Sequence, residues 1–115
     1  MSRPTLAAAG AALLALGGAV CFQPSVAGAA DAKAGKEKAA MCRACHGLNG
    51  VAVAIDAPNI AGDSEIYLER QLKAYRSGER KHEQMSVIAE GLDDADIADL
   101  VAWYSSIKIT ARMPP

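Results

Sequence analysis

Residues 42–46 read Cys-Arg-Ala-Cys-His, and this motif constrains the chain more than any other feature. Two cysteines separated by two residues and followed at once by histidine form the pattern of covalent haem attachment, in which each thiol adds to one haem vinyl group. The residue after Cys45 then lies under the ring, so His46 is the predicted proximal ligand of the iron. The motif therefore predicts one haem c, held through Cys42 and Cys45.

Two other kinds of site use cysteines at this spacing, a zinc site and a thioredoxin-like redox pair. Zinc needs four ligands, and once Cys21 is set aside only His82 is left to join Cys42, Cys45 and His46. A thioredoxin-like pair would need a surrounding βαβ pattern, and the sequence shows no such pattern. Covalent haem is the interpretation that the motif favours.

Residues 1–30 have the pattern of a secretory signal peptide. Arg3 supplies a short positive region, and residues 6–20 form an uncharged run dominated by Ala, Leu and Gly. The alternative is an uncleaved membrane anchor, for which a run this short and this rich in Ala and Gly is weak. We expect export across a bacterial inner membrane to the periplasm, and no stable membrane anchor after cleavage.

Two overlapping small-x-small cleavage signals, residues 27–29 and 28–30, end this segment. The mature chain is therefore expected to start at Ala30 or Asp31. The rest of the chain, residues 31–115, is predicted to be a single domain, because no internal repeat or linker divides it.

The charge of the mature chain excludes one class of partner. Without Arg3, 11 of the 12 basic residues remain, against 13 acidic residues. Nucleic-acid binding needs a basic face, and this balance gives no basic excess. We expect no nucleic-acid partner.

Four helical segments are predicted in the mature chain from helix formers, caps and terminating glycines. They cover residues 31–41, the stretch from Asp63 or Ser64 to Gly78, residues 85–90, and the residues from Asp93 onward. In the second segment, apolar side chains at Ile66, Leu68, Leu72 and Tyr75 are predicted to share one broad face.

The last segment has the clearest periodicity. Ile97, Leu100, Val101 and Tyr104 follow the i, i+3, i+4, i+7 spacing of one helix face. This stripe is predicted to be core.

Residues 51–55, between the haem motif and the second helix, are predicted to form a loop that lines the haem pocket, with a short strand as the alternative. Residues 51–55 are small and apolar, and Pro58 follows in a turn. The Pro58 carbonyl is free to accept a hydrogen bond. A proximal histidine usually donates its outer N–H to such a partner, which fixes the ring plane. Pro58 is therefore the candidate partner of His46.

A second axial ligand is expected, because six-coordinate iron suits a haem that only passes electrons. Met85 is favoured, since it lies far enough after His46 for the chain to wrap around the ring, where a loop meets a short helix. Met113 lies in the terminal tail. His82 and an open site stay as alternatives. A Met/His pair favours a higher reduction potential than two histidines.

With these residues placed, the chain resembles the class I c-type cytochromes, and within them the bacterial c4/c553-like monohaem group. The resemblance covers nearly all of residues 33–107. It is carried by Gly35, residues 42–47, residues 57–62, Tyr67-Leu68, Gln71-Leu72, residues 75–78 with Arg80, Met85, and Leu92 with Asp96-Ile97 and Leu100.

The resemblance implies an all-α fold, the class I cytochrome c fold, with about four helices wrapped around one covalently bound haem. It also implies that the first and last helices cross, with Gly35 against Trp103 and Tyr104.

For the site, the resemblance implies His46 and Met85 as the axial metal ligands and Pro58 as the carbonyl partner of His46. The function that follows is a periplasmic monohaem carrier that shuttles single electrons between redox protein partners, and not an enzyme. The alternative is a dedicated haem subunit of a periplasmic dehydrogenase or oxidase complex, so a monomer or such a subunit is expected. A haem ligand sensor or peroxidase with an open iron site is the third possibility.

Overall fold

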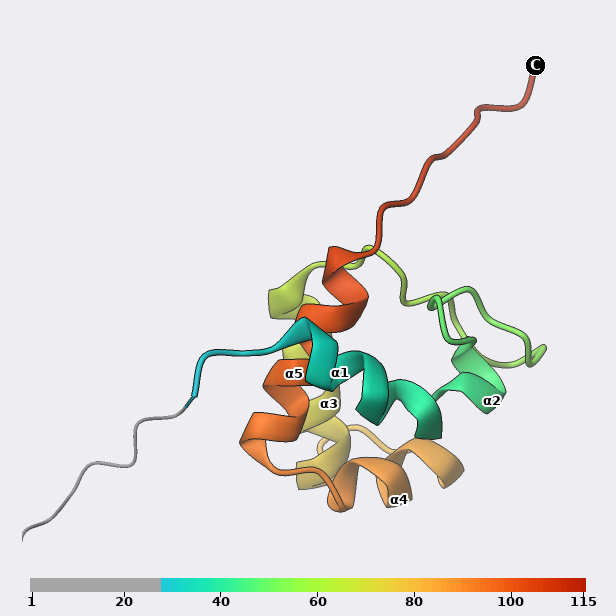
Figure 1. The fold of residues 1–115 in the computed structure, drawn as a ribbon. Helices are drawn as coiled ribbons and strands as arrows, with labels where there is room; N and C mark the ends of the chain where they lie inside the picture. The colour runs from blue at the N-terminus through green and yellow to red at the C-terminus, as the bar shows by residue number, and fades with distance from the viewer. Residues whose placement is uncertain (1–27) are drawn as a thin grey trace, which may run out of the picture.

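The computed structural model describes residues 28–115, and this part of the chain is helical, with no strand (Figure 1). The elements are α1 (Ala32–Lys38), the 3-10 turn η1 (Ala39–Met41), α2 (Arg43–His46), α3 (Glu65–Ser77), α4 (Glu83–Glu90) and α5 (Asp94–Ser106). None of the described helices has the length and apolar character needed to cross a membrane. The signal peptide predicted for residues 1–30 lies almost wholly outside the described residues.

The predicted crossing of the first and last helices is confirmed, and it depends on Gly35. α1 packs against α5, and Figure 1 shows α1 lying across the face of α5. A Cβ on Gly35 would lie 1.9 Å from the Asp99 carbonyl oxygen and 2.9 Å from the Trp103 Cβ. The close approach is therefore to the backbone of α5 and to Trp103 rather than to Tyr104. Ala39, one turn later, is fully buried on the same seam.

Ion pairs reinforce this crossing at its edge. The Lys38 ammonium lies 2.8 Å from a carboxylate oxygen of Asp96 and 2.8 Å from one of Asp99. These hydrogen bonds raise the pKa of Lys38 and lower the pKa values of both aspartates. All three groups therefore stay charged at neutral pH.

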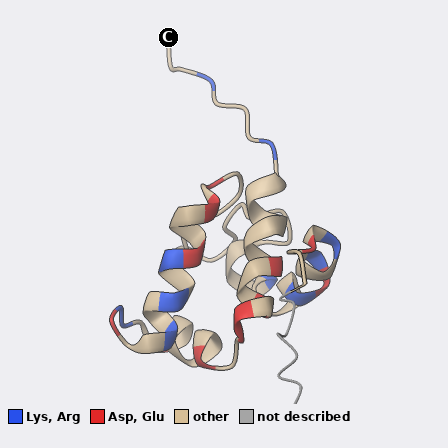
Figure 2. Ribbon diagram, turned by 90° about the vertical axis from the view of Figure 1, so that its left-hand side faces the viewer, with Lys and Arg blue, Asp and Glu red and all other residues tan. Residues whose placement is uncertain are grey.

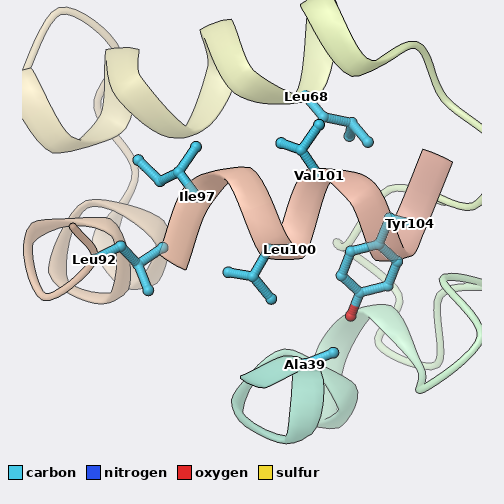
Figure 3. Close-up of a cluster of buried hydrophobic side chains, with 7 residues drawn as sticks. All are labelled: Ala39, Leu68, Leu92, Ile97, Leu100, Val101 and Tyr104. Atoms are coloured by element: carbon cyan, nitrogen blue, oxygen red, sulfur yellow. The ribbon is translucent and has the colours of Figure 1, made fainter. Parts of the chain in front are cut away.

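The buried core follows α5. Figure 3 shows Ile97, Leu100, Val101 and Tyr104 projecting from this helix, so the predicted stripe is confirmed. Three side chains from other parts of the chain complete the cluster: Ala39, Leu68 and Leu92. Asp93 begins the helix with a reciprocal capping box to Asp96.

α3 begins and ends close to the predicted positions. Ser64, not Asp63, is the N-cap, because its hydroxyl accepts a hydrogen bond from the Tyr67 N–H at 3.1 Å. Gly78 ends the helix in the left-handed region, with φ of 78°. The predicted apolar face was wrong at Ile66, whose side chain is 73% exposed. Ile66 lies two positions before the buried Leu68, and residues at that spacing point to different sides of a helix.

α4 begins two residues earlier than predicted. His82 is its N-cap, and its Nδ1 accepts a hydrogen bond from the Met85 N–H at 3.4 Å. Histidine is not among the usual capping residues, so no capping signal in the sequence marks this start.

We predict that Gly35→Ala destabilises the haem-loaded protein by about 2 kcal/mol or more, because the added methyl group overpacks the α1–α5 crossing. Gly91→Ala is the matched control. Gly91 has φ of −82°, and a Cβ there would meet nothing nearer than the Ile88 carbonyl oxygen at 3.6 Å. Denaturant unfolding of both variants measures the difference. Equal losses of stability would contradict the prediction.

Candidate haem-binding site

The cysteine motif folds into a short helix at the edge of one large cavity. Cys42 is the N-cap of α2, and its carbonyl oxygen accepts the His46 N–H at 2.9 Å. Gly47 then turns the chain, with φ of 70°. Cys42, Cys45 and His46 all line the same cavity of about 330 Å³. One turn of helix thus presents both thiols and the imidazole to a single space.

The His46 ring is fixed by the loop that follows the motif. His46 is buried, and its Nδ1 lies 2.9 Å from the Pro58 carbonyl oxygen. A carbonyl oxygen only accepts hydrogen bonds, so Nδ1 carries a proton, and the tautomer of imidazole that fits this contact has its lone pair on Nε2. The loop itself is held by hydrogen bonds from the Ala52 N–H to Asn59 at 2.7 Å and from the Ile60 N–H to Gly50 at 2.8 Å.

Two of the three candidates for the second ligand share this cavity. Met85 and His82 both line it, whereas Met113 is 89% exposed and lies in the extended tail. His82 uses Nδ1 to cap α4, and its ring meets Tyr75 edge-on with centroids 6.4 Å apart.

Polar side chains gather at one side of the otherwise apolar cavity. Arg80 stacks over the Tyr75 ring at 4.7 Å and donates a hydrogen bond to Gln71, and all three residues line the cavity. Arg76 instead binds the Leu92 carbonyl oxygen at 3.1 Å and Asp94 at 2.6 Å. The sequence alone does not bring Gln71, Tyr75 and Arg80 together, because their convergence depends on the packing of α3 against the loop before α4.

Tyr104 contributes an unpaired hydroxyl to the cavity wall. Its Oη is buried and makes no hydrogen bond of ordinary geometry among the described residues, although it lies close enough to the Cys42 thiol for the two groups to affect each other's pKa. Figure 3 shows this oxygen directed toward the segment that carries Ala39, next to the motif. Burial raises the pKa of Tyr104 and that of the neighbouring Cys42 thiol. An orphaned donor in such a place indicates that a further group belongs in the cavity.

The residues present fit a covalently bound haem. Two thiols, an imidazole with a free nitrogen and a thioether line one cavity, and most of the other residues around it are apolar or aromatic, among them Leu72, Ile88 and Val101. The zinc alternative finds no support, since the described part of the chain holds no cluster of three or more His, Cys, Asp or Glu side chains placed to bind a metal ion.

Helices that enclose an apolar cavity, with a Cys-x-x-Cys-His motif opening onto it, define a class I c-type haem protein. The sequence profile of cytochrome c matches residues 32–108. The chain belongs to the cytochrome c family, and it binds haem c covalently through Cys42 and Cys45.

Individual relatives agree with this assignment. Cytochrome c-554(548) from Halomonas halodenitrificans is 49% identical over 81 residues, which cover 68% of this chain and 98% of that protein. Cytochrome c4 from Pseudomonas aeruginosa is 40% identical over 85 residues, 74% of this chain and 42% of that protein. The crystal structure of reduced recombinant cytochrome c4 from Pseudomonas stutzeri has a TM-score of 0.65 and 38% identity, covering 70% of this chain and 47% of that one.

The chain therefore spans nearly the whole of one relative and less than half of the cytochromes c4. A further relative, from Thiomonas intermedia, is named a thiosulfate dehydrogenase electron acceptor. It is 37% identical over 79 residues, which cover 68% of this chain and 36% of that protein.

We predict that Tyr104→Phe lowers the stability of the haem-loaded protein by about 1 kcal/mol, because the hydroxyl gains its partner only in the complete cavity. Denaturant unfolding of the holoprotein measures this loss. Should the hydroxyl stay unpaired with haem in place, the phenylalanine variant would be as stable as the original or more stable, which would contradict the prediction.

Proposed function

We propose that this chain is a periplasmic monohaem electron carrier whose iron is ligated by His46 and Met85. On this proposal residues 1–30 are a cleaved signal peptide and residues 31–115 form the working domain. The bound haem supplies a one-electron iron couple, and no bond is made or broken in a substrate. The observation that carries the proposal is the shared cavity, which His46 and Met85 both line.

His46 suits the proximal position because its orientation is set before any ligand binds. His46 Nδ1–H donates a hydrogen bond to the Pro58 carbonyl oxygen at 2.9 Å, which leaves Nε2 as the ring nitrogen available to a metal. A fixed ring changes little in position when the iron changes oxidation state. This favours rapid electron transfer over chemistry at an open site.

Met85 suits the distal position better than His82 does. It lies in the first turn of α4, so its backbone is held by the helix and by the His82 cap. His82 is an exposed residue whose Nδ1 is already engaged in that cap. A thioether ligand opposite an imidazole also favours a higher reduction potential.

We predict that Met85→Leu gives a folded, haem-loaded protein with a lower reduction potential and with new binding of carbon monoxide by the ferrous iron. Leucine conserves most of the volume of methionine, so we expect a packing cost below about 1.5 kcal/mol. Potentiometry and absorption spectra with and without carbon monoxide measure both effects.

His82→Asn is the matched control for this experiment. Asparagine keeps a strong N-cap for α4 but removes the imidazole from the cavity. We expect the potential and the spectrum to stay unchanged. If His82→Asn opened the iron to carbon monoxide and Met85→Leu did not, His82 would be the ligand and the proposal would be wrong.

Electrons are proposed to enter and leave beside the loop that follows the motif. Val53 is 71% exposed and Ile55 is fully exposed, and residues 51–55 carry no charge. Elsewhere, charges of both signs are spread over the described helices (Figure 2). An uncharged apolar contact beside the cysteines suits a small, transient docking interface.

We predict that Ile55→Asp slows electron self-exchange between oxidised and reduced copies of the protein, because it places a charge in each half of the encounter surface. NMR line broadening in mixtures of the two oxidation states measures the rate. Ile66→Asp is the matched control, since Ile66 is also exposed but lies on α3. Equal slowing by both substitutions would argue against residues 51–55 as the contact.

A dedicated haem subunit of a periplasmic dehydrogenase or oxidase complex is the second candidate. It is favoured by the likeness to the Thiomonas intermedia protein that is named a thiosulfate dehydrogenase electron acceptor. Affinity purification of the tagged chain from its own bacterium distinguishes the two candidates. A catalytic subunit in stoichiometric amount would favour the second, and the isolated cytochrome alone would favour the free carrier.

A further inference from the structure

Asp31 connects the start of the helical domain to its last helix. Residues 28–30 are exposed and non-helical, and Asp31 caps α1 by accepting the Lys33 N–H at 2.8 Å. The backbone N–H of Asp31 itself donates to Oδ1 of Asp99 at 2.8 Å. The chain therefore reaches α5 one residue before α1 begins.

Asp99 belongs to a cluster with Asp96 and Lys38, and these three side chains carry a net charge of −1. Its side chain is 14% exposed, and its Oδ2 binds the Lys38 ammonium at 2.8 Å. Lys38 also binds Asp96 at 2.8 Å, so two carboxylates share one cation. In the described part of the chain, Oδ1 of Asp99 receives only a neutral peptide N–H. A cation at the position of the Asp31 nitrogen would balance the cluster.

We infer that the signal peptide is cleaved between Ala30 and Asp31, and that the new α-ammonium of Asp31 forms an ion pair with Asp99 that fastens α1 to α5. This inference rests on the proposed signal peptide. Cleavage adds one water across the peptide bond. The Ala30 carbonyl becomes a carboxylate, and the Asp31 nitrogen is released as an amine that takes up a proton.

The two cleavage signals found in the sequence would have different consequences for the contact with Asp99. The signal at residues 28–30 leaves Asp31 at the amino terminus, so the charge arises on the nitrogen that already lies 2.8 Å from Asp99. The signal at residues 27–29 would leave Ala30 first, and Asp31 would keep a neutral N–H. A hydrogen bond from a charged donor is roughly twice as strong as one from a neutral donor.

On balance, the charged groups around the new terminus favour the ammonium. Asp99, Asp96 and the carboxylate of Asp31 itself favour the ammonium, and Lys38 opposes it. Lys36 of α1 lies over the Trp103 ring at 5.4 Å on the same seam. On this inference, the excess of carboxylates raises the pKa of the new α-amino group above its ordinary range of about 7.7–8.0. The stabilisation is complete below that range and is lost as the pH rises through the raised value.

The test compares two haem-loaded proteins, one starting at Asp31 and one starting at Ala30, each with and without Asp99→Asn. At neutral pH we expect the Asp31 form to have an equilibrium constant for unfolding about threefold smaller. This advantage should disappear in the Asp99→Asn background. Asp94→Asn is the matched control on the same helix, because Asp94 pairs with Arg76, and there the advantage should persist.

Intact mass of the exported protein gives the natural start directly, and we expect Asp31. A start at any other residue, or an advantage that survives Asp99→Asn, would overturn the inference. An uncleaved chain that still carries a Met-ligated, reducible haem would overturn it while leaving the electron-transfer proposal intact. A chain that starts at Asp31 but whose iron binds carbon monoxide would support the cleavage inference and contradict the proposed ligation by Met85.

Discussion

The contact between Gly35 and the backbone of α5 is the constraint on which the rest of the structure depends. Only a residue without a side chain lets α1 approach to the point where a Cβ would lie 1.9 Å from the Asp99 carbonyl oxygen. From that crossing, α1 continues through η1 directly into Cys42. The same α5 presents Leu100, Val101 and Tyr104 to the cavity. One close approach therefore sets the distance between the haem motif and the main wall of its pocket.

The other half of the pocket is formed by α3, α4 and the loop between them. α3 packs on both α4 and α5, and it carries Tyr75 to the side of the cavity where Arg80 stacks. α4 is short, and its first turn brings Met85 to the cavity. The side of the pocket that carries His46 is thus held by hydrogen bonds, and the side that carries Met85 is held by helix packing and one cap.

Much of this arrangement could be predicted from sequence, and the reasons are local. The Cys-x-x-Cys-His spacing defines its own chemistry, and the four apolar positions from Ile97 to Tyr104 define a helix face without knowledge of its partner. Gly78 and Asp93 mark a helix end and a helix start through backbone preferences that act within a few residues.

What the sequence could not supply depends on contacts between distant segments. The apolar character of Ile66 suggested burial, but its direction is fixed by which side of α3 faces α5. The sequence presents His82 as a candidate metal ligand, because its capping role appears only once the chain before α4 has a defined path. The different roles of Arg76 and Arg80 also depend on the fold. Arg76 donates hydrogen bonds to Leu92 and Asp94, whereas Arg80 stacks on the Tyr75 ring.

The loop after the motif combines exposure with fixed geometry. Val53 and Ile55 are exposed apolar residues, yet the N–H groups of Val53 and Ala54 both donate to the Cys45 carbonyl oxygen, at 2.9 and 3.1 Å. The Trp103 indole holds the start of the same loop through the Leu48 carbonyl oxygen at 3.3 Å. An apolar surface tied in this way to Cys45 and to α5 has little freedom to lose on contact. A partner docking there would meet a preformed surface, so the ordering cost that weakens flexible interfaces is small.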